Sequence, residues 1–149
     1  MRWYAPSFGN QPLNSVMRVK RTVGNPPGHP NADGWFNIKY IIPGGIQNAN
    51  HLRPGVPFSG TTRTAWIPND EGGRHVLSLL RKAFDHRHIF TIGDSITTGV
   101  HNVPVWVIHH KTSQTGGPPN YGFPDPGYYE RVIEELGTVG ITRETLDLH

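Results

Sequence analysis

Hydrophobic and polar residues alternate in two segments near the start of the chain, residues 16–20 and 35–42. The second segment places four large apolar side chains on one face: Phe36, Ile38, Tyr40 and Ile42. A period of two residues is typical of strands with one buried face. Residues 24–34, which lie between the two segments, are rich in Gly, Pro and Asn. We therefore predict a hairpin with a long loop.

A period of three to four residues follows in residues 71–84, with apolar positions at Val76, Leu77, Leu80, Ala83 and Phe84. This spacing predicts a helix with one apolar stripe that packs on a sheet. We expect Asn69-Asp70 to open this helix, after a short strand at residues 64–67.

A second helix is predicted after Asp125-Pro126, which we interpret as an N-cap followed by proline at the first helical position. We expect Gly137 or Gly140 to end it. Its apolar stripe consists of Tyr129, Val132, Ile133 and Leu136.

Two further runs, residues 88–92 and 103–108, are apolar on both faces, as buried central strands are. Pro104 fits the beginning of a strand or an edge position. Together these elements predict an α+β fold. We expect a single compact domain over residues 1–149, with a mixed or antiparallel sheet, two main helices and long Gly/Pro-rich loops.

Composition narrows the class of protein. The 149 residues suit one domain, and the net charge of +3 is compatible with an anionic partner but too small to require nucleic acid. The absence of Cys excludes disulfides, a thiol nucleophile and a zinc-bearing RING within this chain. The sequence that starts at residues 1–6 lacks the apolar region of a signal peptide, and no apolar run is long enough to span a membrane. We expect a monomeric intracellular protein, cytoplasmic or nuclear, without membrane contact.

The strongest chemical feature is His109-His110 at the end of an apolar run. Adjacent strand residues face opposite sides, so only one imidazole would enter a given pocket. One interpretation is a core histidine bonded to backbone beside a surface histidine. The other is a hydrogen-bonding or proton-transfer group. No HExxH or paired Cys/His spacing occurs, and we expect no metal.

Three weaker features leave alternatives open. Residues 91–99 offer hydroxyls and backbone N–H groups for a phosphate, or form a plain turn, because no GxGxxG or GxxxxGK[ST] is present. Glu135 lies at the border of the polar face of its helix, where it lines a cleft or is a solvated surface carboxylate. Arg18, Lys20 and Arg21 favour an exposed strand face over a nucleic-acid site. The sequence contains no GxSxG motif, so we do not infer a hydrolase.

Taken together, the motifs resemble one family, the carboxy-terminal domain of the Deltex ubiquitin ligases, over about positions 9 to 141. The resemblance is carried by Gly9-Asn10-Gln11-Pro12, Ile42-Pro43-Gly44-Gly45-Ile46-Gln47, the helix at residues 71–84, Ile89-Phe90-Thr91-Ile92-Gly93, Thr97-Thr98-Gly99, Trp106, Ile108-His109-His110-Lys111-Thr112 and Tyr121-Gly122-Phe123-Pro124-Asp125-Pro126.

The resemblance implies a domain that binds NAD or ADP-ribose in a cleft. In the family this domain follows a RING that recruits ubiquitin-loaded E2, and ubiquitin is attached to ADP-ribose or to ADP-ribosylated protein or nucleic acid. By position, Ser95 and His109 would contact ADP-ribose, Tyr121 would lie beside the ribose, and Glu135 would act on the hydroxyl that receives ubiquitin. Glu135 and Tyr121 are thus the expected catalytic residues. The other expected binding residues are Thr97, Thr98, His110, Gly122 and Phe123.

Several positions depart from the family pattern. Some members have His where this chain has Tyr121, and a phenol is a weaker base near pH 7 than an imidazole, which favours Glu135 as the base. The usual His-Pro-x-Pro-Gly is replaced by residues 51–55, His-Leu-Arg-Pro-Gly. A RING and E2 would have to be supplied in cis or in trans. The alternatives are a reader of ADP-ribose without chemistry, or a protein-interaction module.

Overall fold

A computed structural model describes residues 7–148, so the segment 1–6 discussed above lies outside the described residues. The main sheet is antiparallel and has the order β1 (Val16–Thr22), β2 (Trp35–Ile42), β5 (Thr61–Pro68). Val19 pairs with Ile38, and Ile38 pairs with Ala65. The predicted hairpin of β1 and β2 is confirmed. β5 is longer than the four residues expected for it, because it pairs with β2 along its whole length.

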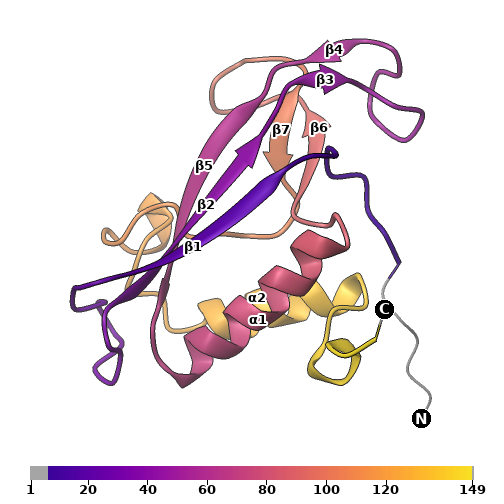
Figure 1. The fold of residues 1–149 in the computed structure, drawn as a ribbon. Helices are drawn as coiled ribbons and strands as arrows, with labels where there is room; N and C mark the ends of the chain where they lie inside the picture. Colours follow the sequence, from indigo (N-terminus) through magenta and orange to yellow (C-terminus); the bar gives the residue numbers. More distant parts are fainter. Residues whose placement is uncertain (1–6, 149) are drawn as a thin grey trace.

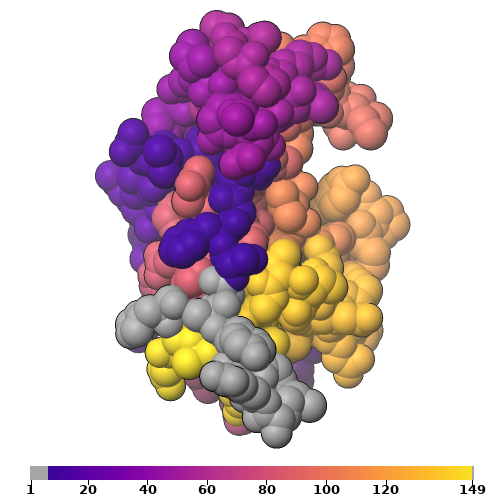
Figure 2. Space-filling model, turned by 90° about the vertical axis from the view of Figure 1, so that its right-hand side faces the viewer, coloured from indigo at the N-terminus to yellow at the C-terminus, as the bar shows by residue number. Residues whose placement is uncertain are grey.

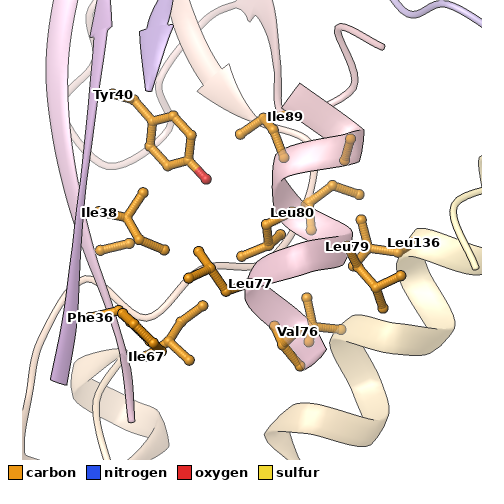
Figure 3. Packing of buried hydrophobic residues seen from close by; sticks show 14 of the residues in the cluster. Phe36, Ile38, Tyr40, Ile67, Val76, Leu77, Leu79, Leu80, Ile89 and Leu136 are labelled. Atoms are coloured by element: carbon orange, nitrogen blue, oxygen red, sulfur yellow. The ribbon is translucent and has the colours of Figure 1, made fainter. Parts of the chain in front are cut away.

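Helix α1 (Glu71–Asp85) lies between the sheet and helix α2 (Tyr128–Thr138), so the core has three layers (Figure 1). Leu77 and Leu80 point toward the sheet, whereas Leu79 lies against Leu136 of α2 (Figure 3). Asp70 caps α1 as predicted, because its carboxylate accepts the Gly73 N–H at 2.8 Å. The α1 stripe predicted from the period is buried except for partly buried Phe84.

The predicted cap of α2 is wrong. This helix begins after Gly127 and has no side-chain cap. The Asp125 carboxylate instead accepts from Lys111 Nζ at 2.6 Å and from Arg131, and these two cations hold its pKa at about 2. Lys111 is only 1% exposed, and burying an ammonium without an anion would be costly. The ion cluster therefore takes the side chain that a cap would have used.

The two apolar runs do not form central strands. β6 (Phe90–Gly93) and β7 (Val103–Trp106) pair only with each other, in a separate antiparallel ribbon. Pro104 is at an edge position as expected, because both strands of a two-stranded ribbon are edges. The remaining elements are short: β3 (Gly45–Ile46) with β4 (Pro57–Phe58), and the 3-10 turns η1 (Pro118–Asn120) and η2 (Arg143–Thr145). The predicted α+β class with antiparallel sheets and two main helices is confirmed.

Candidate functional site

A cavity of about 550 Å³ opens between the connection from β6 to β7 and the segment that follows β7. Figure 2 shows it as a hollow between these two parts of the chain. This volume is in the range of small-molecule sites. Six of the nine predicted site residues line the cavity: Ser95, Thr97, Thr98, His109, His110 and Tyr121.

The other three predicted residues lie behind the cavity wall. Phe123 is fully buried in the core and packs edge-on against Trp35, with ring centroids 5.4 Å apart. Gly122 is buried where a Cβ would come within 2.0 Å of the Thr115 carbonyl oxygen. Glu135 projects from α2 and reaches the backbone of His109. These three residues do not line the cavity themselves.

One wall is a loop that we call the pocket loop, residues 95–100. Ser95 N–H donates to the Val100 carbonyl and Gly99 N–H donates to the Ser95 carbonyl, both at 2.8 Å. The Ser95 hydroxyl also accepts from Thr98 N–H at 3.3 Å. The loop is therefore a compact turn, and its hydroxyl-bearing residues Ser95, Thr97 and Thr98 line the cavity.

His109 is held from behind by α2. Its backbone N–H donates to Glu135 Oε1 at 3.0 Å, and its carbonyl accepts from the Tyr128 hydroxyl at 3.0 Å. Its ring nitrogen Nε2 is buried and has no hydrogen-bond partner among residues 7–148. Burial, with a smaller contribution from Lys111, lowers the pKa of the His109 imidazole, so the ring is neutral at pH 7.

His110 belongs to the core as much as to the cavity. Its Nδ1–H donates to the Ile108 carbonyl at 2.8 Å, so Nε2 accepts from the Tyr40 hydroxyl at 2.7 Å. The ring stacks on Trp106 with centroids 4.3 Å apart. Burial lowers its pKa to about 4, which keeps it neutral. This matches the core interpretation, except that one partner is a side chain.

Both imidazoles border the cavity, contrary to the expectation that only one would. The physical reason is that β7 ends at Trp106, so strand alternation does not extend to residues 109 and 110. His109 instead faces Tyr121 across the cavity, with ring centroids 6.4 Å apart.

Tyr121 has a left-handed backbone conformation, with φ 53° and ψ 39°, at the end of η1. A bulky residue rarely adopts this conformation, and such outliers cluster at functional sites. Its side chain is 58% exposed, so a ligand in the cavity would meet the phenol directly.

Sequence reasoning missed two charged residues of the wall, Arg63 and Asp94. Arg63 pairs in register with Tyr40, so it lies on the inner face of the sheet. That register would have revealed Arg63, but the sequence showed only a short strand at residues 64–67. Asp94 has no signal beyond its place before Ser95.

Among residues 7–148, no cluster of three or more His, Cys, Asp or Glu is arranged to hold a metal ion. Within the same residues, no helix combines the length and apolar character needed to cross a bilayer.

The molecule is thus an α+β domain with a cavity lined by polar, aromatic and aliphatic side chains, and comparison with known proteins places it in a family. The model of the Deltex C-terminal domain matches residues 8–141. The probable E3 ubiquitin-protein ligase DTX3 of Homo sapiens is 49% identical over 142 residues, which cover 95% of this chain and 41% of that protein. The chain belongs to the Deltex C-terminal domain family.

Two further relatives agree. The E3 ubiquitin-protein ligase DTX4 of Mus musculus is 42% identical over 145 residues, covering 95% of this chain and 23% of that protein. The E3 ubiquitin-protein ligase DTX1 of Homo sapiens is 39% identical over 142 residues, covering 93% of this chain and 23% of that protein. The chain therefore spans less than half the length of the curated relatives that it matches.

Proposed function

We propose that this domain binds ADP-ribose or NAD and supplies the acceptor site for ubiquitin transfer to ADP-ribose or to ADP-ribosylated protein or nucleic acid. A RING in cis or in trans would bring the ubiquitin-loaded E2. The domain would act as a monomer, in the cytoplasm or the nucleus. Membership of a family whose relatives are named ubiquitin ligases supports the transfer context.

The observation that carries the nucleotide part is that His109 lines the cavity while its buried Nε2 has no hydrogen-bond partner among residues 7–148. Buried polar atoms are almost always paired, so an unpaired one beside a cavity indicates a ligand or water partner. The hydroxyls of Ser95, Thr97 and Thr98 lie on the same cavity. Neutral donors of this kind satisfy ribose and phosphate oxygens without a large positive charge.

Titration calorimetry with ADP-ribose and then NAD at pH 7 tests this binding. We expect saturable micromolar binding, weakened by Ser95→Ala and by His109→Ala, because each removes a polar group from the wall. Thr138→Ala is the matched control, since that hydroxyl is exposed on α2 and bonds only the Glu135 carbonyl in the described chain. A folded protein that does not saturate at ~1 mM, about −4 kcal/mol, would favour an interaction module.

Glu135 is proposed to take the proton from the ADP-ribose hydroxyl that accepts ubiquitin. Its Oε1 already holds the His109 backbone, and its Oε2 makes no hydrogen bond to residues 7–148. The carboxylate would therefore have two separable roles: one oxygen fixes the cavity wall, and the other is available as a base.

Two substitutions separate these roles. Glu135→Gln keeps an oxygen that accepts from His109 N–H but removes the base, whereas Glu135→Ala removes both. With RING, E2 and ubiquitin supplied, we expect Glu135→Gln to lose transfer and keep ADP-ribose affinity. Transfer that persists in Glu135→Gln would overturn the catalytic role and leave Glu135 as a positioning residue. If the native chain binds ADP-ribose but gives no transfer with RING, E2 and ubiquitin supplied, the domain is a reader.

A further inference from the structure

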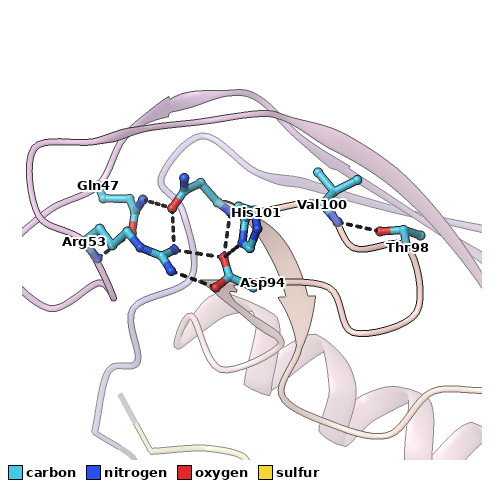
Figure 4. Close-up of polar contacts among 7 residues, drawn as sticks. Gln47, Arg53, Asp94, Thr98, Val100 and His101 are labelled. Carbon is cyan, nitrogen blue, oxygen red and sulfur yellow. Dashed lines mark hydrogen bonds and ion pairs between the residues drawn. The ribbon is translucent and has the colours of Figure 1, made fainter.

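A bidentate ion pair lies directly behind the pocket loop. Arg53 Nη1 donates to Asp94 Oδ1, and Arg53 Nη2 donates to Asp94 Oδ2, each at 2.8 Å (Figure 4). Arg53 Nη1 also donates to Asn102 Oδ1 at 2.8 Å, and Gln47 Nε2 donates to the same oxygen at 3.0 Å. The guanidinium therefore joins the loop that contains residues 47–55 to both ends of the connection between β6 and β7.

This junction is the anchor of the pocket loop. Every hydrogen bond that residues 95–100 make within the described chain joins two residues of the loop itself. The connection between β6 and β7 is tied to other parts of the chain at its base, where Arg53 donates to Asp94 and to Asn102. The Asn102 carbonyl also accepts from Ser59 N–H at 3.1 Å. Isolated surface ion pairs contribute little, but a bidentate pair within a network fixes geometry.

Asp94 also places a carboxylate on the cavity wall. Asp94 and Arg63 are the charged side chains among the lining residues, because His109 and His110 are both neutral. The Arg53 hydrogen bonds, aided by Asn102 N–H and by His101 Nδ1 at 3.1 Å, hold the pKa of the Asp94 carboxyl well below its usual range. The carboxylate is thus charged at neutral pH, and unpaired it would repel a diphosphate.

We propose that Arg53 is a positioning residue of this cavity: by binding Asp94 it fixes the base of the pocket loop and cancels the carboxylate charge, so that the cavity accepts an anionic ligand. The inference deepens the proposed function and rests on it for the identity of the anion.

The first test needs no ligand. Hydrogen exchange on the ligand-free domain should show faster exchange of the amides of residues 95–100 in Arg53→Ala than in the native chain, because the loop loses its anchor. Arg53→Lys keeps the positive charge but cannot make both hydrogen bonds to the Asp94 carboxylate, so it should give an intermediate rate of hydrogen exchange. Arg74→Ala is the matched control, since Arg74 is exposed on α1 and bonds Asn69, away from the cavity lining.

The second test measures ADP-ribose affinity at low and high ionic strength. Arg53→Ala should weaken binding about fivefold or more at low salt and less at high salt, because salt screens the uncovered carboxylate. Adding Asp94→Asn to Arg53→Ala should recover affinity at low salt. A purely structural role would predict neither the salt dependence nor this recovery.

The outcomes separate the two proposals. If the native chain does not bind ADP-ribose, the proposed function fails, and the exchange rates alone decide whether Arg53 anchors the loop. If binding occurs but Arg53→Ala changes neither loop exchange nor affinity, the role of Arg53 is overturned. An affinity loss that is independent of salt and not recovered by Asp94→Asn would overturn the charge-cancelling role.

Discussion

The adjacent residues His109 and His110 differ in whether their ring nitrogens are already hydrogen-bonded within the protein. His110 uses both ring nitrogens inside the protein, whereas His109 keeps Nε2 unpaired among the described residues. The first therefore supports the wall, and the second is the one that we propose for ligand recognition. This division follows from the partners that the fold provides and not from residue type.

Removing the Tyr40 hydroxyl should destabilise the domain. Tyr40→Phe leaves the buried Nε2 of His110 without its donor, and an unsatisfied buried acceptor costs about 1–3 kcal/mol. Urea unfolding measures the loss. Tyr121→Phe is the control, because the Tyr121 hydroxyl bonds no described residue and its removal should change stability by less than about 0.5 kcal/mol. Equal effects of the two substitutions would show that the Tyr40 bond contributes nothing.

Stability should fall as the pH drops from about 6.5 toward 4. In the unfolded chain His110 takes up a proton near the ordinary histidine pKa of 6.5, whereas burial keeps the folded imidazole neutral until the pH approaches its pKa of about 4. The unfolded state then binds more protons, so acid favours unfolding, by about 1.4 kcal/mol per pKa unit or roughly 3 kcal/mol in all. His75 and His109, whose pKa values are also lowered, add in the same direction.

Urea unfolding at a series of pH values, together with the NMR titration of the His110 ring, measures this effect. The pKa of Asp125 is lowered to about 2, so the contribution of that carboxylate to stability is lost mainly below pH 4. The pH ranges in which His110 and Asp125 affect stability are therefore distinct. A His110 ring that titrates near 6.5 in the folded protein would contradict the assignment.

At the scale of helices, two glycines should respond oppositely to the same change. Gly73→Ala places a Cβ 1.8 Å from the Pro68 carbonyl oxygen, which is backbone and cannot move aside. We expect a loss of about 1–3 kcal/mol. Gly137→Ala in α2 meets nothing within 4 Å, so the better helix propensity of Ala should raise stability by about 0.5 kcal/mol. Thermal unfolding of both variants checks the signs, and stabilisation by Gly73→Ala would show that the turn before α1 relaxes.

An element could be predicted from the sequence where its own hydrophobic period determines it, and not where contacts with other parts of the chain determine it. The periods of β2, α1 and α2 survive in the fold because each packs one face on the core. The cap of α2 was mispredicted because the Asp125 carboxylate is bound by Lys111, which lies in another part of the chain. β6 and β7 were misplaced because an apolar run does not specify its pairing partner.

The cavity is a property of the whole molecule, since β5, the connection after β6, and the segments before and after η1 all contribute to its wall. Resemblance to a family identified six residues of that wall, because residues at matching motif positions take the same place in the folded domain. It could not identify Arg63, Asp94 or the support from Arg53. Those contacts depend on strand register and on loops that meet only in three dimensions.

Ligand binding should therefore stabilise the domain as a whole. His109 is tied to α2 through Glu135 and Tyr128, so a ligand held by His109 is released when α2 separates from the wall. At a concentration of 100 times Kd, ADP-ribose should add about 2.7 kcal/mol to the free energy of unfolding. For a domain of this size that corresponds to a rise in Tm of roughly 5–10 °C. His109→Ala should show a smaller rise at the same ligand concentration, and Thr138→Ala should match the native chain. Calorimetric binding without any rise in Tm would place the ligand on a segment that detaches independently, and would contradict a cavity built from the whole fold.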